Sequence, residues 1–324
     1  MTEMNLVEAV RSAMDTEMER DEKVLVMGED VGEDGGVFRA TDGLMEDYGE
    51  ERVIDTPLSE SGIVGTAFGL AVRGFRPVAE IQFMGFTYPA FDQITSHVSR
   101  IRNRSRGSYT APMVVRAPYG GGIHAPEHHS ESTEALYAHI PGLKVAIPSN
   151  PSDAKGLLSS AIRDPDPVMF WEPKKIYRAF EEEVPEGEHT VPLGEAEVVE
   201  EGEDITVISW GAMVRPVKKA AEEADASVEV VDLRSITPLD MDTISGSVQE
   251  TGKLVIVHEA PKTSGFGAEV SATIAENTDD LFSLEAPIKR VTGFDTVFPL
   301  YKREEEYLPG VKRIKDAVEE VNSF

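Results

Sequence analysis

Residues Val53–Gly74, VIDTPLSESGIVGTAFGLAVRG, place one carboxylate, Glu60, directly before a run without charges from Ser61 to Val72. The three glycines and two alanines of this run would let a helix pack tightly against its neighbours, so we expect a buried helix. A carboxylate at the mouth of an apolar helix either caps the helix or is kept protonated for proton transfer. The segment alone leaves both readings open.

On both sides of this segment, β-rich apolar runs alternate with helical patterns. The expected strands are 23–27, 77–83, 113–117, 144–148, 168–171, 205–210, 228–233, 254–258 and 289–292. The expected helices are 6–20, 61–72, 89–103, 152–163, 214–224, 240–250, 267–276 and 311–321. Strands that are apolar throughout and separated by helices indicate parallel sheets covered on both faces. The sequence therefore predicts an α/β protein.

The length of 324 residues suits two domains, each with a core of its own. The stretch 180–204 is rich in Glu and contains Pro and Gly, which is typical of an exposed linker. We therefore predict a first domain at 1–185, a linker at 186–204 and a second domain at 205–324.

Acidic residues outnumber basic ones by 59 to 31, which gives a net charge of −28. Such a surface argues against nucleic acid as a partner, because phosphate binding needs a basic face. Either a basic protein partner or a cytoplasm of high salt would explain the charge, and the even spread of the acids favours the salt.

The chain has no run long enough for a membrane span, since its longest stretch without charges has 12 residues where about 20 are needed. It contains no cysteine, and its acidic first segment lacks the features of a secretory signal. We therefore expect a cytoplasmic protein with no membrane contact.

Histidines and carboxylates gather in HAPEHHSE, residues 124–131, directly after the triple glycine 120–122. A metal site is disfavoured, because Pro126 prevents the helical spacing of zinc hydrolases. A glycine-rich loop that presents one catalytic histidine is favoured, with a structural histidine as the alternative. The triple glycine matches neither nucleotide-binding glycine pattern.

Two further segments could carry chemistry. Phe83, Phe86, Tyr88 and Phe91 form an aromatic cluster, which packs in a core or stacks on a flat ring. Glu29 lies just past the end of the first predicted strand, where ligands of parallel sheets bind, although a turn also uses such residues.

Eight blocks along the chain follow one another as in a known family. They are MGEDVG (27–32), GGVF (35–38), RVIDTPLSE (52–60), RPVAEIQF (76–83), PAFDQI (89–94), APEHHSES (125–132), PGLKV (141–145) and DAKGLLSSAIRDPDPV (153–168). Over essentially its whole length, the chain resembles the beta subunit of the thiamine-diphosphate-dependent decarboxylating component of 2-oxo acid dehydrogenase complexes. Pyruvate and branched-chain 2-oxo acid dehydrogenases belong to this family.

The resemblance implies a pyrimidine-binding thiamine diphosphate domain with a doubly wound parallel sheet, followed by a transketolase C-terminal domain. The family holds the diphosphate and its Mg²⁺ through a Gly-Asp-Gly motif on a separate alpha subunit, and no such motif occurs here. The implied partners are that alpha subunit, in a tetramer of two alpha and two beta chains, and a dihydrolipoyl acyltransferase core.

The resemblance also assigns roles to residues. Glu60 matches the glutamate that hydrogen-bonds the cofactor's aminopyrimidine ring and so activates it, and Glu29 matches an acid near that ring. Phe86 matches the aromatic residue that stacks on the ring, with Leu58 and Gln82 in the same pocket. His129 matches the histidine that orients the carboxylate of the 2-oxo acid or assists the acylation of lipoamide. His128 is ranked second.

A structural potassium site is implied as well. The matching residues are Met113, Ala161, Ile162, Asp164 and Asp166, whose carbonyl and carboxylate oxygens suit a hard cation.

Other functions stay open beside the dehydrogenase. An acetoin dehydrogenase beta subunit would look alike in these blocks, and pyruvate and branched-chain substrates differ too subtly for a motif. A self-contained transketolase or deoxyxylulose-type synthase would need the absent diphosphate motif. A non-catalytic scaffolding subunit with an acidic docking surface would not need Glu60, Phe86 and His129.

Overall fold

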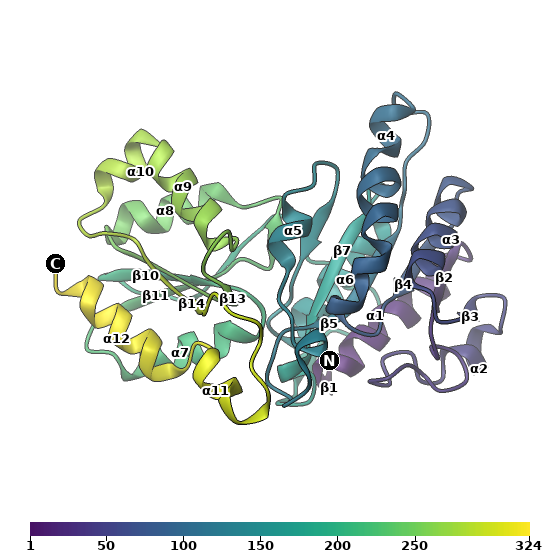
Figure 1. The fold of residues 1–324 in the computed structure, drawn as a ribbon, viewed down its shortest axis with the longest axis horizontal. Coiled ribbons are helices and arrows are strands. Elements are labelled where there is room, and N and C mark those ends of the chain that lie inside the picture. The colour runs from purple at the N-terminus through teal and green to yellow at the C-terminus, as the bar shows by residue number, and fades with distance from the viewer.

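Two mainly parallel sheets, each covered by helices on both faces, form the two halves of the computed structural model, which describes residues 1–324 (Figure 1). The predicted α/β class is confirmed, and each of the nine expected strands is present. None of the helices combines the length and apolar character needed to cross a bilayer.

The first sheet has seven strands in the order β12-β6-β7-β5-β4-β2-β3. They are β2 (Val24–Gly28), β3 (Val53–Asp55), β4 (Arg76–Glu80), β5 (Val114–Tyr119), β6 (Lys144–Ala146), β7 (Val168–Pro173) and β12 (Ser235–Thr237). Every neighbouring pair is parallel except β12 with β6. Because β12 follows strands of the second sheet along the chain, it ties the second half of the protein to the first.

Successive side chains along each strand of the first sheet point to opposite faces and so contribute to two apolar layers. In β2, Val24 and Val26 join the layer under α1 (Leu6–Arg20) and α6 (Pro151–Arg163). Leu25 and Met27 of the same strand join the opposite layer, under α3 (Glu60–Val72) and α5 (Glu134–Ala138). Burial on both faces explains why these strands read as continuous apolar runs.

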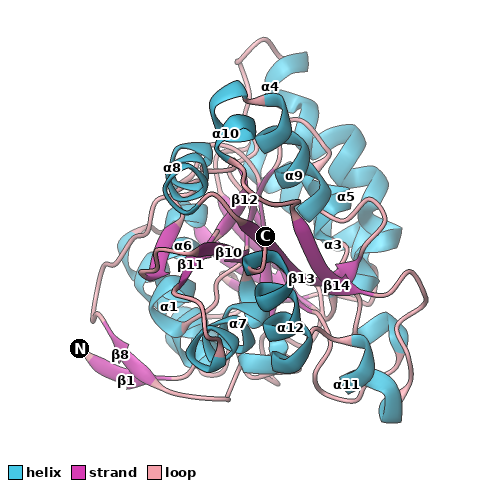
Figure 2. Cartoon of the chain, turned by 90° about the vertical axis from the view of Figure 1, so that its left-hand side faces the viewer, coloured by secondary structure: helices cyan, strands magenta, loops and turns pink.

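The second sheet has the order β14-β13-β10-β11-β9. Its strands are β9 (Glu197–Glu200), β10 (Ile205–Ser209), β11 (Val228–Asp232), β13 (Leu254–Pro261) and β14 (Lys289–Gly293). On one face lie α8 (Met241–Thr251), α9 (Gly267–Glu276) and α10 (Thr278–Ser283), and on the other α7 (Val214–Glu223) and α12 (Val311–Asn322) (Figures 1 and 2). The last helix is packed as predicted, with Ile314, Val318 and Val321 buried.

Shorter elements complete the chain. They are β1 (Thr2–Met4) paired with β8 (Glu182–Val184), α2 (Leu44–Tyr48), α11 (Glu304–Tyr307), and the 3₁₀ turns η4 (Glu127–His129), η5 (Lys174–Ile176), η6 (Gly211–Met213) and η7 (Tyr301–Arg303). Figure 2 shows the β1–β8 pair standing away from both sheets, beside the N-terminus.

Two sequence predictions differ from the structure. The helix expected at 89–103 is broken into a 3₁₀ segment η1 (Met84–Ala90), a π segment η2 (Gln93–His97), a 3₁₀ turn η3 (Val98–Arg100) and α4 (Ile101–Arg104). Pro89 lies inside η1 and has no amide hydrogen to donate to the hydrogen bonds of a regular helix. Helix α3 is only half buried, because Ile63, Val64 and Ala67 face the core while Gly62 and Gly69 face solvent.

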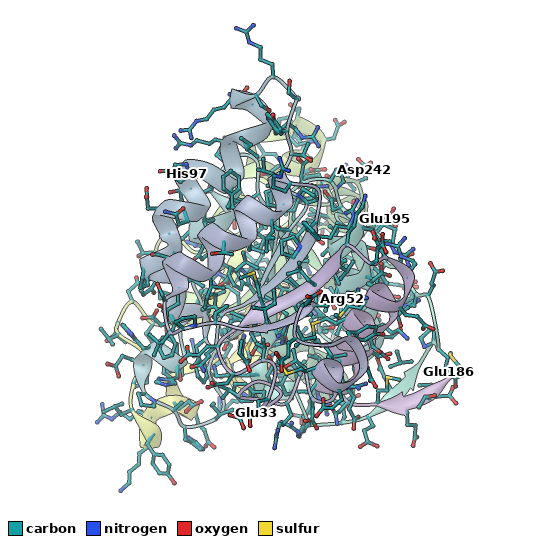
Figure 3. The ribbon with its side chains drawn as sticks, turned by 90° about the vertical axis from the view of Figure 1, so that its right-hand side faces the viewer. Glu33, Arg52, His97, Glu186, Glu195 and Asp242 are labelled. Carbon is teal, nitrogen blue, oxygen red and sulfur yellow. The ribbon has the colours of Figure 1, made fainter.

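Within the residues predicted as a linker (186–204), β9 pairs antiparallel with β11 and belongs to the second sheet. The domain bounds themselves stay a prediction. Acidic side chains such as Glu33, Glu186, Glu195 and Asp242 are exposed at separate places on the surface (Figure 3), as expected from their spread along the sequence.

Candidate active site

The residues predicted to act in chemistry follow the carboxyl ends of neighbouring strands in the first sheet. Glu29 comes directly after β2, Gln82 two residues after β4, and the segment from Gly120 directly after β5. Since these strands are parallel, their carboxyl ends meet at one edge of the sheet, which is where α/β proteins bind ligands. The fold thus brings distant parts of the chain to one edge.

Glu60 is the first residue of α3, and Ser59 before it is the helix cap. The Ser59 hydroxyl oxygen accepts a hydrogen bond from the amide of Gly62 at 3.3 Å. The reading of Glu60 as the cap is therefore wrong, and its half-buried carboxylate is left available for a ligand.

Glu29 lies close enough to Glu60 for the two carboxylates to affect each other. Burial raises the pKa of Glu29, and the charges of Asp30 and Glu60 raise it further. Two neighbouring acids that repel each other favour a proton on one of them.

Phe86 and His129 meet at the next position along the edge. The ring centroids of Phe86 and His129 are 5.0 Å apart, and those of Phe83 and His129 are 4.5 Å apart, both in edge-to-face geometry. Phe83 is buried and Phe86 half-buried, so core packing holds for the first ring while the second is partly open to solvent. Phe83 and Phe86 of the aromatic cluster thus pack against the ring of His129.

His129 is half-buried, whereas His128 is exposed. Desolvation lowers the pKa of His129, and the charges of Lys174 and His128 lower it further. Its Nδ1 is buried and has no hydrogen-bond partner within the chain. A neutral imidazole with an unpaired nitrogen is suited to donate or accept a hydrogen bond with a substrate.

The histidine loop, residues 120–131, carries both histidines and is closed at its base by a hydrogen bond. The amide of Gly120 donates a hydrogen bond to the carbonyl of Glu131 at 2.9 Å, which joins the two ends of the loop. The Tyr88 hydroxyl donates to the Glu131 carboxylate and fastens the loop to η1. The expected histidine loop is thus anchored at its base, with η4 at its tip.

These residues fit the pyrimidine half of thiamine diphosphate. The half-buried ring of Phe86 and the side chain of Leu58, which is 72% exposed, offer apolar contact to a flat ring. The neighbouring carboxylates of Glu29 and Glu60 offer hydrogen bonds to ring nitrogens. Nowhere do three or more His, Cys, Asp or Glu side chains gather as a metal site would require.

A buried ion cluster under the site was missed by the sequence analysis. Arg116 on β5 donates to Glu172 on β7 through Nε (2.6 Å) and Nη2 (2.7 Å), and through Nη1 to Glu80 on β4. The hydroxyl of Tyr177 donates to Glu172 at 2.6 Å. Charged residues inside otherwise apolar strands (VAE, VVRAP, MFWEP) were the signal that could have revealed this cluster.

The predicted potassium residues lie away from this edge, before β5 and β7 rather than after them. Arg76 donates to the carbonyls of Ile162 (2.8 Å) and Asp164 (3.2 Å). The carboxylate of Asp164 pairs with Lys144, and that of Asp166 with Arg102 at 2.6 Å.

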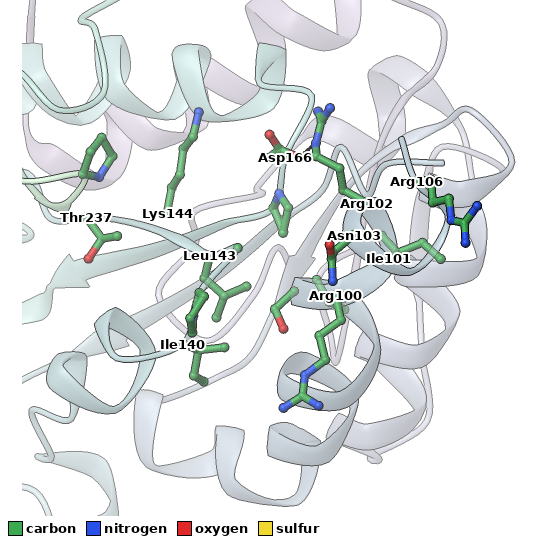
Figure 4. Close-up of a pocket in the computed structure, with 16 residues that line it drawn as sticks. Arg100, Ile101, Arg102, Asn103, Arg106, Ile140, Leu143, Lys144, Asp166 and Thr237 are labelled. Atoms are coloured by element: carbon green, nitrogen blue, oxygen red, sulfur yellow. Dashed lines mark hydrogen bonds and ion pairs between the residues drawn. The ribbon is translucent and has the colours of Figure 1, made fainter. Parts of the chain in front are cut away.

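The two other predicted potassium ligands also have donors from the chain. The carbonyl of Met113 accepts from the amide of Val168 at 3.0 Å, and that of Ala161 from the amide of Asp164 at 3.3 Å. Lys144, Arg102 and Asp166 line a cavity of about 1030 Å³ (Figure 4). Side-chain cations thus pair with both carboxylates of this loop, and the potassium site stays a prediction.

Comparison with known families defines the class of protein. The family described as "Transketolase, pyrimidine binding domain" matches residues 2–179, and "Transketolase, C-terminal domain" matches residues 194–314. A chain of the solved structure titled "Split gene transketolase, inactive beta4 tetramer" is similar over 99% of this chain and 98% of its own, with a TM-score of 0.81 and 22% identity. The fold is that of transketolase-type thiamine enzymes.

Curated relatives narrow the class to one family. Pyruvate dehydrogenase E1 component subunit beta of Staphylococcus epidermidis is 53% identical, with 97% of each chain covered. The proteins of the same name from Bacillus subtilis and Staphylococcus aureus are 52% and 51% identical, with both chains fully covered. The chain belongs to the family of E1 beta subunits of 2-oxo acid dehydrogenases.

Proposed function

We propose that this chain, with an alpha subunit, catalyses the oxidative decarboxylation of a 2-oxo acid on thiamine diphosphate and passes the acyl group to lipoamide. The proposal is supported by Glu29 beside Glu60 and by Phe86 beside His129, both pairs following the carboxyl ends of parallel strands in a member of the E1 beta family. Pyruvate is the favoured substrate, because the relatives named here are pyruvate dehydrogenase subunits.

Each residue would have a distinct role. Thiamine diphosphate, when bound, supplies a nucleophilic carbon and an electron sink for the leaving carboxylate. Glu60 would hydrogen-bond a nitrogen of the pyrimidine ring and share a proton with it, with Glu29 as the neighbouring acid. Phe86 would stack on the ring, while Leu58 and Gln82 line its pocket.

His129 would act on the substrate side of the site. Its neutral ring can donate a hydrogen bond to the carboxylate of the 2-oxo acid or to the incoming lipoyl group. Phe83 and Phe86 fix the plane of the ring, which limits the orientation entropy lost in the reaction.

The proposed partners follow because this chain offers residues for only the pyrimidine half of the cofactor. An alpha subunit would hold the diphosphate and its Mg²⁺ in a tetramer of two alpha and two beta chains, and an acyltransferase core would receive the acyl group. The half-exposed face of α3 and the exposed Leu58 are apolar surfaces that such a partner would cover. The domain bounds 1–185 and 205–324 are part of this proposal.

The test is an assay of the reconstituted alpha–beta pair with pyruvate, branched-chain 2-oxo acids and acetoin. We expect Glu60→Gln to abolish decarboxylation and to leave assembly intact, whereas Glu50→Gln, the same change at an exposed position, should be silent. Acetoin cleavage without 2-oxo acid turnover would instead identify an acetoin dehydrogenase subunit. Full activity of Glu60→Gln would remove Glu60 from the mechanism. A wild-type pair that neither binds thiamine diphosphate nor turns over any of these substrates would leave the scaffolding alternative.

A separate variant tests the histidine. His129→Ala should keep cofactor binding but lose most transfer to lipoamide, and His139→Ala is the exposed control. Normal activity of the whole complex with His129→Ala would remove that residue from the mechanism.

A further inference from the structure

The segment GGVF, residues 35–38, belongs to the loop that leaves β2 directly after Glu29, and we call residues 30–41 the GGVF loop. Gly36 has a φ of +78°, which residues with a side chain rarely adopt. In this conformation its amide donates a hydrogen bond to the carbonyl of Asp30 at 2.7 Å. The loop is therefore folded back onto its own start, beside an acid of the candidate site.

Phe38 in this loop contacts two other aromatic rings. The centroid of its half-buried ring lies 5.6 Å from that of Phe83 and 5.1 Å from that of Tyr177, both in edge-to-face geometry. Such pairs are attractive beyond the apolar surface that they bury. The carbonyl of Phe38 also accepts a hydrogen bond from Nη2 of Arg178 at 2.7 Å. Both the ring and the backbone of Phe38 are thus held in place.

The two partner rings connect Phe38 to different parts of the site. Phe83 lies edge-to-face on His129, with ring centroids 4.5 Å apart. The hydroxyl of Tyr177 donates at 2.6 Å to Glu172, which belongs to the buried ion cluster. A continuous row of contacts therefore runs from this cluster through three aromatic rings to the imidazole.

His129 depends on its aromatic neighbours for its orientation. Its Nδ1 has no hydrogen-bond partner within the chain, so that nitrogen does not fix the plane of the ring. The rings of Phe83 and Phe86 lie against it instead. Because protein interiors are close-packed, a side chain that packs against Phe83 also limits how far Phe83 and the imidazole can move.

We propose that Phe38 is a positioning residue, which acts through Phe83 to hold the ring of His129 in place for acyl transfer. The effect on the reaction rests on the proposed function, whereas the restraint of the imidazole rests on the ring contacts alone. Since the GGVF loop starts beside Glu29, it would join the acid on the cofactor side of the site to the histidine on the substrate side.

Phe38→Leu tests the proposal in the reconstituted alpha–beta pair, because leucine keeps an apolar side chain but removes the ring. We expect transfer to lipoamide to fall about tenfold, since a small misplacement of a catalytic group has a large effect on rate, and thiamine diphosphate affinity to stay unchanged. Phe38→Tyr keeps the ring and should retain most of the transfer. The matched control is Phe180→Leu, because the ring of Phe180 is also half-buried on the same apolar layer but pairs with Arg215 in α7. This control should leave transfer unchanged.

A double-mutant cycle separates positioning from a general loss of structure. In the His129→Ala background, Phe38→Leu should cause no further loss of transfer, because the side chain through which Phe38 acts is already gone. A loss by the same factor in both backgrounds, or no loss in either, would overturn the proposal.

Chemical labelling gives a readout that needs no activity. Diethyl pyrocarbonate modifies accessible neutral imidazoles, and mass spectrometry reads each histidine separately. A released His129 should be labelled about fivefold faster in Phe38→Leu than in wild type, because local opening exposes it. The exposed His97 and His139 serve as references and should keep their rates. Unchanged labelling of His129 would overturn the proposal.

A second variant covers the case in which Phe38→Leu fails to assemble. Arg178→Met then decides, because it removes the hydrogen bond to the Phe38 carbonyl from an exposed position and must also speed the labelling of His129. An inactive wild-type pair that shows the labelling difference would refute the proposed function and leave the restraint of the imidazole valid.

Discussion

Gly85 lies directly against the carbonyl oxygen of His128, so closely that a Cβ at Gly85 would stand 2.2 Å from that oxygen. Segment η1 and the histidine loop can therefore approach only because position 85 has no side chain. This contact sets the distance between Phe86, one residue further on, and the ring of His129.

Gly85→Ala should accordingly push the histidine loop away from the aromatic pocket. We expect acyl transfer to fall by about tenfold or more, since an error near 1 Å in a catalytic group has a large effect on rate. Overpacking should also lower the free energy of unfolding by about 1–3 kcal/mol. Steady-state kinetics and urea unfolding of the purified variant measure the two effects.

The control for Gly85→Ala is Gly246→Ala in α8, where no atom lies within 4 Å of the added Cβ. That exposed change should stabilise the protein by about 0.5–1 kcal/mol, because alanine has the higher helix propensity. An alanine at position 85 with wild-type activity would contradict the role given to the glycine.

Arg116→Met should lower the free energy of unfolding more than most substitutions outside the candidate active site. It leaves the carboxylates of Glu80 and Glu172 buried without their cation, which costs about 3–5 kcal/mol in comparable sites. Chemical denaturation measures this loss. Arg73→Met removes an exposed guanidinium and should change stability by less than about 0.5 kcal/mol. Equal stability of the two variants would argue against the buried ion cluster.

Asp232 makes the stability depend on pH. Burial, with the nearby charge of Asp153, raises the pKa of Asp232 to about 7 in the folded chain, while its carboxylate accepts from the Ser149 hydroxyl. The folded state therefore holds a proton that the unfolded state releases near pH 4, so stability should fall as the pH rises from about 4 to about 7.

Asp232→Asn removes the titrating carboxyl group and, with it, this contribution to the pH dependence of stability. Relative to wild type, this variant should gain on the order of 2–4 kcal/mol between pH 4 and pH 7, as read from unfolding curves at several pH values. Asp225→Asn, at an exposed site, should track the wild type throughout. A constant difference between Asp232→Asn and wild type would refute the raised pKa.

The potassium loop gives a prediction about salts. Because Arg76, Lys144 and Arg102 already supply cations to this loop, we expect equal unfolding temperatures in KCl and NaCl of the same ionic strength. A stabilisation specific to KCl would instead support the potassium site that the family resemblance implies. Differential scanning calorimetry of the alpha–beta pair makes the comparison.

Much of the architecture could be predicted because it depends on local patterns. Helix α1 was predicted with its observed bounds, since Leu6, Val10, Met14 and Met18 repeat at helical spacing. The central strands are buried on both faces, so each is a continuous apolar run. Such a run can be recognised without knowing which side chains point to which face of the sheet. Edge strands such as β3, β9 and β12 were missed, because they are short and depend on a neighbour for their hydrogen bonds.

The amino-acid sequence by itself determined the α/β class, the family, and the residue types available for the reaction, since strand and helix periodicity and short motifs are local properties. Only the tertiary structure decided that Ser59 rather than Glu60 caps α3, that Phe83 and Phe86 enclose His129, and that Glu259 and Glu304 reach back to the histidine loop. These contacts join segments up to 182 residues apart. They depend on which strand ends meet, and that is settled by the packing of both sheets together.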